Sequence, residues 1–308
     1  MPLSSAPRIG FIGAGRLARC LATGFARAGY PVTAVASRSP QSARELVQQV
    51  GQGSTVDDPQ QAIAAADIVF LTVPDDSIGT MANTLRFDAA NAHSKALVHC
   101  SGASPVELLA PARAQGALTG GFHPLYLFSG SPADIERIAG CSVTIEADSE
   151  LESALSALAR ALACHPLTIP RGTRMLYHGA AHYAASFALC ALSECVELWR
   201  TLGFSEDESL RALLPMLAGT IETARDKGLA DALAGPVSRG DTGVVEKQLA
   251  LFETMSGDHA ALYALLTRRA VALARQRAKP PASIDAIEAA VEASLERSLP
   301  QVQAPRKP

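Results

Sequence analysis

The feature that most constrains this chain is a glycine pattern at the junction of a predicted strand and a predicted helix. Residues 8–18 read RIGFIGAGRLA, an apolar run followed by Gly13-x-Gly15-x-x-Ala18. Gly13 permits a tight turn, Gly15 lets backbone N–H groups approach a phosphate, and Ala18 lets the helix pack closely against the strand. Because a helix N-terminus favours negative charge, the pattern predicts a bound dinucleotide pyrophosphate. The residues expected to hold it are Gly13, Ala14, Gly15, Arg16 and Leu17.

The end of the second predicted strand indicates which dinucleotide binds. The apolar run 31–36 is followed by Ser37, Arg38 and Ser39. NAD-binding proteins carry an acidic residue at this point to hold the ribose 2′-hydroxyl, whereas a guanidinium between two hydroxyls suits a 2′-phosphate. We therefore expect NADP as the cofactor, against the alternative that Arg38 is an incidental residue of a surface turn.

Short apolar runs alternate with amphipathic stretches over the first half of the chain. Further strands are predicted at residues 68–73, 96–100, 117–122, 142–145 and 167–169, and helices at residues 16–28, 41–50, 75–85, 105–115 and 150–162. Strands that are nearly all apolar are typical of a parallel sheet covered on both faces. The predicted fold class is α/β, with a Rossmann-type doubly wound parallel sheet over residues 1–166.

Beyond Pro170 the pattern contains helices only. They are predicted at residues 172–202, 205–227, 243–255, 258–276 and 283–298. The first is rich in alanine, but glutamates and histidines interrupt it, so we reject a transmembrane span. We expect an all-α domain for substrate binding and dimerisation over residues 167–298, and a disordered tail over residues 299–308. Because the Ala-rich face would otherwise leave apolar surface in water, a homodimer is expected.

Composition narrows the possible partners and the compartment. The chain has 308 residues and a formal net charge of −3, and its lysines and arginines are scattered, so neither nucleic acid nor an anionic membrane is expected as a partner. The six cysteines form no Cys-x-x-Cys pair and resemble small buried hydrophobic residues of a reducing compartment. Residues 1–7 lack the pattern of a secretory signal. We therefore expect a cytoplasmic protein.

Polar residues follow the predicted strands at the edge where open parallel sheets bind ligands. The segment Val73-Pro74-Asp75 is placed to border the cofactor's ribose, although Asp75 could equally cap the next helix. Ser101 and Gly102 follow the next strand. They are expected to contact the nicotinamide or a substrate carbonyl, with an ordinary strand-to-helix turn as the alternative. His99, inside the strand, is expected to be structural.

Three further side chains are candidates for the substrate and for proton transfer. His123 follows Gly120-Gly121 at a strand end and is expected to contact the substrate, although a turn residue would fit too. Arg174, His178 and His182 are spaced four apart and share one face of a predicted helix. Arg174 is expected to bind an anionic group, and His178 to relay a proton, which makes His178 and Ser101 the catalytic candidates. His182 fits a packing position equally well. No metal site is expected, because no third ligand accompanies the two histidines.

The segment 235–243, GPVSRGDTG, is predicted to be a loop before a helix. Asp241 or Thr242 can cap that helix, which would not require Arg239. We expect Arg239, with Asp241, to bind an anionic substrate in the cleft between the domains.

Five segments together carry a family resemblance: Gly13-x-Gly15-x-x-Ala18, HCSGA at 99–103, FHPL at 122–125, YHGAA at 177–181 and GPVSRGD at 235–241. With them the whole chain resembles the predicted NADP-dependent oxidoreductases that join a Rossmann domain to a helical domain of the DUF2520 type. These are relatives of pyrroline-5-carboxylate reductase and of an unusual ketopantoate reductase. The long helix also resembles the Lys-x-x-x-Asn pair of β-hydroxyacid dehydrogenases, with Arg174 and His178 at those positions. Family members usually have Asn where this chain has Ser186.

The resemblance implies an NADPH-dependent reductase of a small oxo acid or cyclic imine. A second class of function stays open, a non-catalytic NADP-binding sensor or interaction protein, because one fold hosts many functions and no residue is unambiguously an acid or a base.

Overall fold

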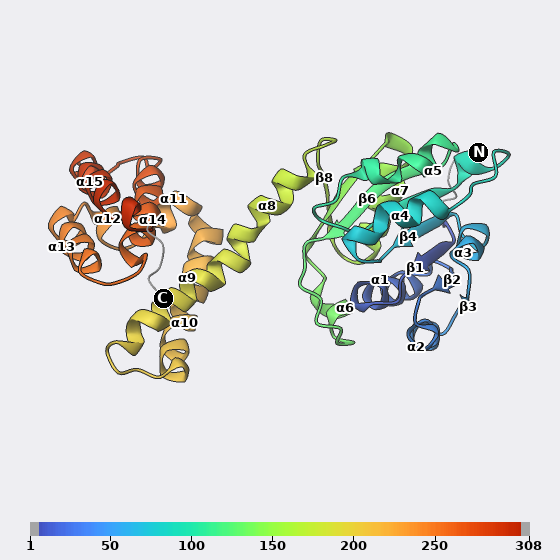
Figure 1. Cartoon of the computed structure of the whole chain (residues 1–308), viewed down its shortest axis with the longest axis horizontal. Coiled ribbons are helices and arrows are strands. Elements are labelled where there is room, and N and C mark those ends of the chain that lie inside the picture. The colour runs from blue at the N-terminus through green and yellow to red at the C-terminus, as the bar shows by residue number, and fades with distance from the viewer. Residues whose placement is uncertain (1–5, 303–308) are drawn as a thin grey trace. The chain divides into compact units, whose positions relative to one another are not determined.

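The computed structural model describes residues 6–302, and its first part folds around one eight-stranded sheet (Figure 1). The strands lie in the order β3-β2-β1-β4-β5-β6-β7-β8. Since the chain moves outward from β1 in one direction and from β4 in the other, the crevice at their carboxyl ends is where such sheets bind ligands. The strand bounds are β1 (Ile9–Ile12), β2 (Val32–Ala36), β3 (Ser54–Val56), β4 (Ile68–Leu71), β5 (Ala96–His99), β6 (Leu118–Pro124), β7 (Ser142–Ala147) and β8 (His165–Thr168).

The direction of the last two strands differs from the prediction. β1 to β6 are parallel, as predicted, but β7 runs antiparallel to β6, and β8 follows the direction of β7. The chain between β6 and β7 carries only the four-residue helix α6 (Asp134–Arg137). It returns to the sheet at the end where β6 finishes, so β7 runs back along β6 with His123 opposite Thr144. A parallel β7 would have required a crossover to the other edge.

Helices cover both faces of the sheet, as a doubly wound fold requires. One face packs against α1 (Arg16–Arg27), α2 (Pro40–Val50) and α7 (Ser149–Ala161), and the other against α3 (Pro59–Ala65), α4 (Asp75–Thr84) and α5 (Ala110–Ala114). Two 3-10 turns, η1 (Ala92–Ser94) and η2 (Val106–Leu109), complete this part. Phe70 lies at the centre of the first core, with ring centroids 5.6 Å from Phe11 and 5.4 Å from Phe122.

The predicted long helix 172–202 is two helices, α8 (Arg174–Ala184) and α9 (Ser186–Arg200). The break is at Ala185, whose φ of −115° and ψ of −84° are not helical. At the same place the His182 Nδ1 and Ser186 Oγ atoms lie 3.2 Å apart. Hydrophobic periodicity alone does not predict this break.

The chain forms two compact units that divide between Ala188 and Leu189. The domain boundary expected at residue 166 lies earlier, because β8 belongs to the sheet and α8 joins the first unit. The helical character expected after Pro170 is confirmed. The remaining helices are α10 (Glu206–Lys227), α11 (Leu229–Ala232), α12 (Pro236–Arg239), α13 (Thr242–Glu253), α14 (His259–Ala274) and α15 (Ile284–Val302).

The second unit has its own core, in which Val245, Val271, Ile287 and Val291 are fully buried. Its last helix, α15, continues through Pro300 to Val302. The disordered tail expected from residue 299 is therefore wrong for residues 299–302, and residues 303–308 lie outside the described part of the chain. A proline near a helix end is tolerated when the lost N–H bond lies in the final turn, which accounts for the difference.

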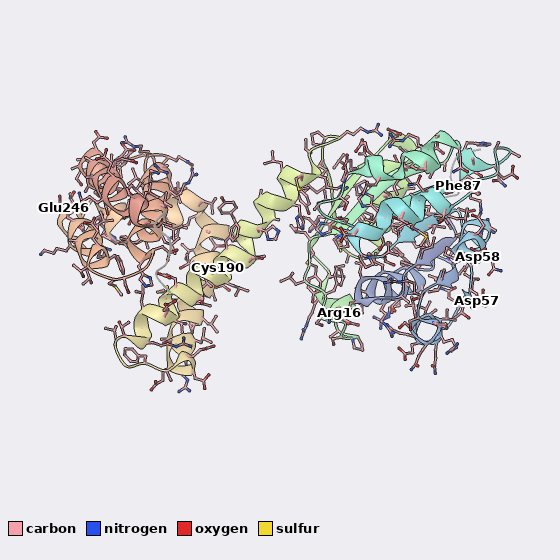
Figure 2. The ribbon with its side chains drawn as sticks, in the orientation of Figure 1. Arg16, Asp57, Asp58, Phe87, Cys190 and Glu246 are labelled. Atoms are coloured by element: carbon pink, nitrogen blue, oxygen red, sulfur yellow. The ribbon has the colours of Figure 1, made fainter. Side chains whose placement is uncertain are left out.

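Cysteine burial agrees only in part with the sequence-based expectation. Cys20, Cys100 and Cys164 are buried, whereas Cys190 is exposed on α9 (Figure 2).

Within residues 6–302, no helix combines the length and the apolar character that a bilayer crossing needs.

Candidate functional site

A pocket of about 570 Å³ lies at the carboxyl ends of β1, β2 and β4. Its position matches the crevice expected for a ligand in this fold. Seven of the predicted cofactor-binding residues line it: Gly13, Ala14, Gly15, Ser37, Arg38, Val73 and Pro74.

The two fingerprint glycines differ, because only Gly13 is required by space and by backbone conformation, whereas Gly15 borders open space. Gly13 has a φ of +113°, and a Cβ atom there would come within 2.4 Å of the Thr72 carbonyl oxygen. A Cβ atom on Gly15 would meet no atom within 4 Å, so the volume beside the first turn of α1 is open. The free N–H groups of that turn and its positive dipole end suit a pyrophosphate, so these residues fit a dinucleotide.

Arg38 is placed to hold a second anionic group at the other end of the pocket. Its side chain is exposed and forms no ion pair with another residue in the range 6–302. Ser39 is the N-cap of α2 and accepts a hydrogen bond from the Ser42 N–H at 3.2 Å, so its hydroxyl is already used. Ser37 and Ser42 line the pocket beside Arg38, but the Ser42 hydroxyl donates to Ser39 Oγ at 3.0 Å. The Arg38 guanidinium and the Ser37 hydroxyl therefore remain as donors for a 2′-phosphate.

Several predicted cofactor residues lie outside the lining of this pocket. Arg16 begins α1 and its side chain lies against Gly130, and Leu17 packs against the core, so each would contribute its backbone N–H (Figure 2). Asp75 is bound to Ser101 instead, and its neighbour Asp76 lines the pocket. Asp75 also makes no capping bond to α4, so the alternative interpretation of Asp75 as a helix cap is wrong.

Thr72 and Asp57 are among the pocket residues that were not predicted. Thr72 follows β4, where the strand-end argument used for Val73 would have found it. Asp57 follows β3, a short, largely exposed strand that hydrophobic periodicity does not reveal. Its neighbour Asp58 is the N-cap of α3, whose carboxylate accepts the Gln60 N–H at 2.9 Å (Figure 2).

A second group of polar side chains surrounds the turn after β5. The Ser101 hydroxyl donates to Asp75 Oδ2 at 2.6 Å and accepts the N–H groups of Ala103 and Ser104 at 3.2 and 2.9 Å. Three hydrogen bonds therefore fix this turn. Because Asp75 lies between the pocket residues Pro74 and Asp76, its bond to Ser101 connects the turn to the dinucleotide pocket.

Gly102 brings two histidines against the same turn. A Cβ atom there would come within 2.4 Å of His178 Cδ2 and 2.8 Å of His123 Cε1, so only glycine fits without displacement. The two imidazole centroids lie 5.9 Å apart, and His123 Nδ1 lies 3.2 Å from the Tyr177 hydroxyl. The structure thus brings together four predicted residues, Ser101, Gly102, His123 and His178. It adds Tyr177, which lies in the segment 177–181 that carries the family resemblance but was not predicted as a site residue.

His123 is held neutral near pH 7. Burial, then the positive charge of Arg174 and the proximity of His178, together lower its pKa to about 4, against a smaller opposite effect of Asp75. A neutral imidazole can donate or accept a hydrogen bond but does not attract an anion by charge. His123 is therefore suited to a carbonyl, imine or hydroxyl group rather than to a carboxylate.

Arg174 is not placed as the predicted anion-binding residue. Its side chain is 1% exposed, its Nε donates to Glu146 Oε2 at 2.9 Å, and its Nη1 donates to the Ser101 carbonyl oxygen at 3.0 Å. It lies against Gly121, where a Cβ atom would come within 2.1 Å of Nη2. Because Glu146 already neutralises this guanidinium, Arg174 is not available for a substrate anion. Its bond to the Ser101 carbonyl oxygen instead holds the turn in place. Sequence spacing could not reveal Glu146, because the reversal of β7 brings it beside Gly121.

His99 is fully buried on β5, in agreement with its expected structural character. Burial, with smaller effects of Arg174 and His123, lowers its pKa to about 3. Neither ring nitrogen has a hydrogen-bond partner among residues 6–302.

Arg239 and Asp241 belong to the second compact unit, where they pair with each other. Arg239 Nε donates to Asp241 Oδ2 at 2.8 Å, and both side chains are more than one-third exposed. Asp241 occupies the N-cap position of α13 without a side-chain capping bond, and Arg239 ends the one-turn helix α12 rather than lying in a loop. Their binding of substrate stays a prediction. Over the described residues, no three His, Cys, Asp or Glu side chains are grouped as metal ligands.

Two protein families match separate parts of the chain. Residues 8–101 match the family described as NADP oxidoreductase, coenzyme F420-dependent, and residues 141–270 match the domain of unknown function DUF2520. The first match contains the dinucleotide pocket and ends at Ser101, and the second contains His178. No curated protein is similar enough in sequence to match.

Solved structures show the same fold along most of the chain. Protein TM1727 from Thermotoga maritima is 24% identical, with a TM-score of 0.72 over 87% of this chain and 98% of that one. A pyrroline-5-carboxylate reductase from Coxiella burnetii is 16% identical, with a TM-score of 0.58 over 96% and 99%. A reductive aminase from Aspergillus terreus in complex with NADPH and ethyl-5-oxohexanoate is 17% identical, with a TM-score of 0.57 over 96% of each chain.

Proposed function

Because this chain joins an N-terminal domain of the NADP oxidoreductase, coenzyme F420-dependent family to a DUF2520 domain, we propose that it is an NADPH-dependent reductase of a small oxo acid or cyclic imine. The observation that carries the proposal is the turn at Ser101 and Gly102. Two histidines meet this turn, and Asp75 connects it to the dinucleotide pocket. This arrangement supports proton transfer beside a hydride carrier that would bind at an adjacent strand end.

The cofactor is NADP, which when bound supplies the hydride. The first turn of α1, with Gly13, Ala14 and Gly15, holds the pyrophosphate through backbone N–H groups. Ser37 and Arg38 hold the 2′-phosphate through a hydroxyl and a charged hydrogen bond.

The protein residues orient the substrate and supply a proton. His178 donates the proton to the oxygen or nitrogen atom of the reduced double bond, because it is half-buried and lies against the turn at Gly102. Neutral His123 hydrogen-bonds the same substrate atom or an adjacent group. Ser101 keeps the turn in place through Asp75, and its backbone N–H borders the site. Arg239 is the proposed partner of a substrate carboxylate, since the charge of Arg174 is neutralised by Glu146.

The neutral histidine and the similar structures support the proposed substrate class. A carbonyl or imine is a group that a neutral imidazole can hydrogen-bond, and one similar structure is named a pyrroline-5-carboxylate reductase. The direct test is NADPH oxidation by the purified protein with a panel of small oxo acids and cyclic imines, and with coenzyme F420 as a further hydride acceptor. Tight NADPH binding without oxidation by any acceptor would favour the alternative, an NADP-binding sensor.

Replacing Arg38 tests the assignment of the cofactor. We expect Arg38→Ala to weaken NADPH binding about ten- to one-hundredfold, because a charged hydrogen bond to the 2′-phosphate is worth about 1.5–3 kcal/mol. NADH binding should not change, since NADH lacks that phosphate. Fluorescence titration of both cofactors measures the two affinities, with Arg44→Ala, an exposed arginine of α2 outside the pocket lining, as the control. Equal affinity of the unaltered protein for NADPH and NADH would refute the assignment.

Exposed apolar residues on α8 lead us to propose a homodimer in solution. Leu176 is 76% exposed and Tyr183 is 73% exposed, and with Ala180 they form one stripe of the helix. Surface of this kind is usually covered by a partner. Sedimentation at micromolar concentration should give a dimer, and Leu176→Glu combined with Tyr183→Glu should shift it to monomer. Leu127→Glu, which changes a leucine that is 79% exposed outside the helices, is the control. A monomeric unaltered protein would contradict the proposal.

A further inference from the structure

A row of three imidazoles leads along α8 from the turn at Gly102 toward the surface. The ring centroids of His123 and His178 lie 5.9 Å apart, and those of His178 and His182 lie 4.9 Å apart. The row continues to Ser186, whose Oγ lies 3.2 Å from His182 Nδ1. These are side chains that can each accept and donate a proton.

Solvent exposure increases along this row. His123 and His178 are only partly accessible, whereas His182 and Ser186 are both exposed, at the break between α8 and α9. The break places Ser186 at the start of a new helix, beside the His182 ring. An exposed histidine contributes little to packing, so burial does not account for this arrangement.

We propose that His182 and Ser186 form a relay that returns protons from solvent to His178. This inference rests on the proposed reductase function. Reduction of a C=O or C=N bond adds one hydride, supplied by NADPH, to carbon and one proton to oxygen or nitrogen. His178 loses that proton in each turnover and must regain one before the next. His182 donates it and is in turn protonated by water or a buffer acid, so each cycle consumes one proton from solution.

The charges around the row favour entry of the proton at the exposed end. Arg174 lies one helical turn before His178, at the buried end, and although Glu146 pairs with it there, its positive charge lowers the pKa of His123. Asp75, which is bound to Ser101, is the acidic group facing this end, and Tyr177 bonds His123. A positive charge is therefore poorly accommodated on His123, at the buried end of the row.

The ring geometry permits the transfer after a small motion. His178 and His182 are four residues apart on one helix, and their rings meet edge to face at an interplanar angle of 90°. The transfer requires a rotation of one imidazole about χ2, and rotations of exposed side chains such as that of His182 are fast compared with typical turnover. The proposed dimer stripe of Leu176, Ala180 and Tyr183 lies on the opposite side of α8, so dimerisation leaves the relay accessible.

Removing His182 tests the relay. We expect His182→Ala to lower kcat at least about tenfold in weakly buffered solution, with unchanged NADPH affinity and melting temperature, because only reprotonation of His178 is impaired. Added imidazole should restore the rate in proportion to its concentration. His93→Ala, which removes another exposed histidine, on η1, is the matched control and should turn over normally. A normal rate for His182→Ala, or a loss that imidazole does not restore, would overturn the relay.

A second measurement does not depend on reductase activity. Exchange of the His178 ring N–H with solvent, followed by NMR on the cofactor-free protein, should be at least about tenfold slower in His182→Ala than in the unaltered protein or in His93→Ala. Equal exchange rates would overturn the relay even if no substrate is found. The two proposals can fail separately. If the unaltered protein reduces no substrate but exchange is slowed in His182→Ala, the proposed reductase function is refuted and the relay is supported.

Discussion

Replacing His178 with asparagine is expected to lower kcat by about two to four orders of magnitude while NADPH affinity stays nearly unchanged. The imidazole lies against the turn at Gly102, outside the lining of the dinucleotide pocket, so its loss removes the proton donor and not the cofactor contacts. Asparagine keeps a polar side chain of similar reach but cannot supply a proton near neutral pH. Stopped-flow measurement of NADPH oxidation, with cofactor titration and thermal melting of the same preparation, separates these effects.

The matched control changes the neighbouring residue Tyr177 to phenylalanine. This variant loses the 3.2 Å contact with His123 but keeps His178, so its kcat should fall far less. Normal turnover by His178→Asn would exclude His178 as the proton donor. If His178→Asn instead lowered the melting temperature and the rate together, a packing function of His178 would account for both changes.

The dinucleotide pocket could be predicted because its chemistry is local in sequence. Gly13 must adopt a positive φ and Gly15 must leave open space beside α1, and both requirements appear in eleven consecutive residues. Arg38 follows directly from the end of β2. Asp57 was not predicted, because the strand before it, β3, has only three residues and is largely exposed. Hydrophobic periodicity therefore does not reveal that strand.

The environment of Arg174 could not be predicted, since it depends on contacts between distant segments. Glu146 reaches Arg174 only because β7 runs antiparallel to β6, and the sequence pattern of a buried strand is the same in either direction. The structure also shows which group lies against Gly121, the Arg174 guanidinium. The spacing of Arg174 and His178 correctly placed both on one helix face, but it does not distinguish a substrate contact from a buried ion pair.

Replacing Arg174 with methionine is expected to destabilise the fold by about 3–5 kcal/mol, because Glu146 would remain buried without its partner. The two side chains are 1% and 4% exposed, so water cannot compensate for the loss. Arg171→Met is the matched control. Arg171 pairs with Glu107 at the surface, where both side chains are about half exposed, and such pairs contribute at most about 1 kcal/mol. Urea denaturation of both variants measures the difference, and equal stability of the two would contradict the assignment.

The double variant Arg174→Met with Glu146→Leu distinguishes stability from positioning. It removes both charges, so we expect it to be more stable than Arg174→Met alone, since buried ion pairs are often replaced by apolar residues at little cost. The Ser101 carbonyl would still lack the bond from Arg174 Nη1, which leaves the turn at Gly102 less firmly held beside His123 and His178. We therefore expect kcat to stay low in the stabilised double variant while NADPH affinity is kept. Recovery of both stability and kcat would show that Arg174 acts through folding alone and not through the turn.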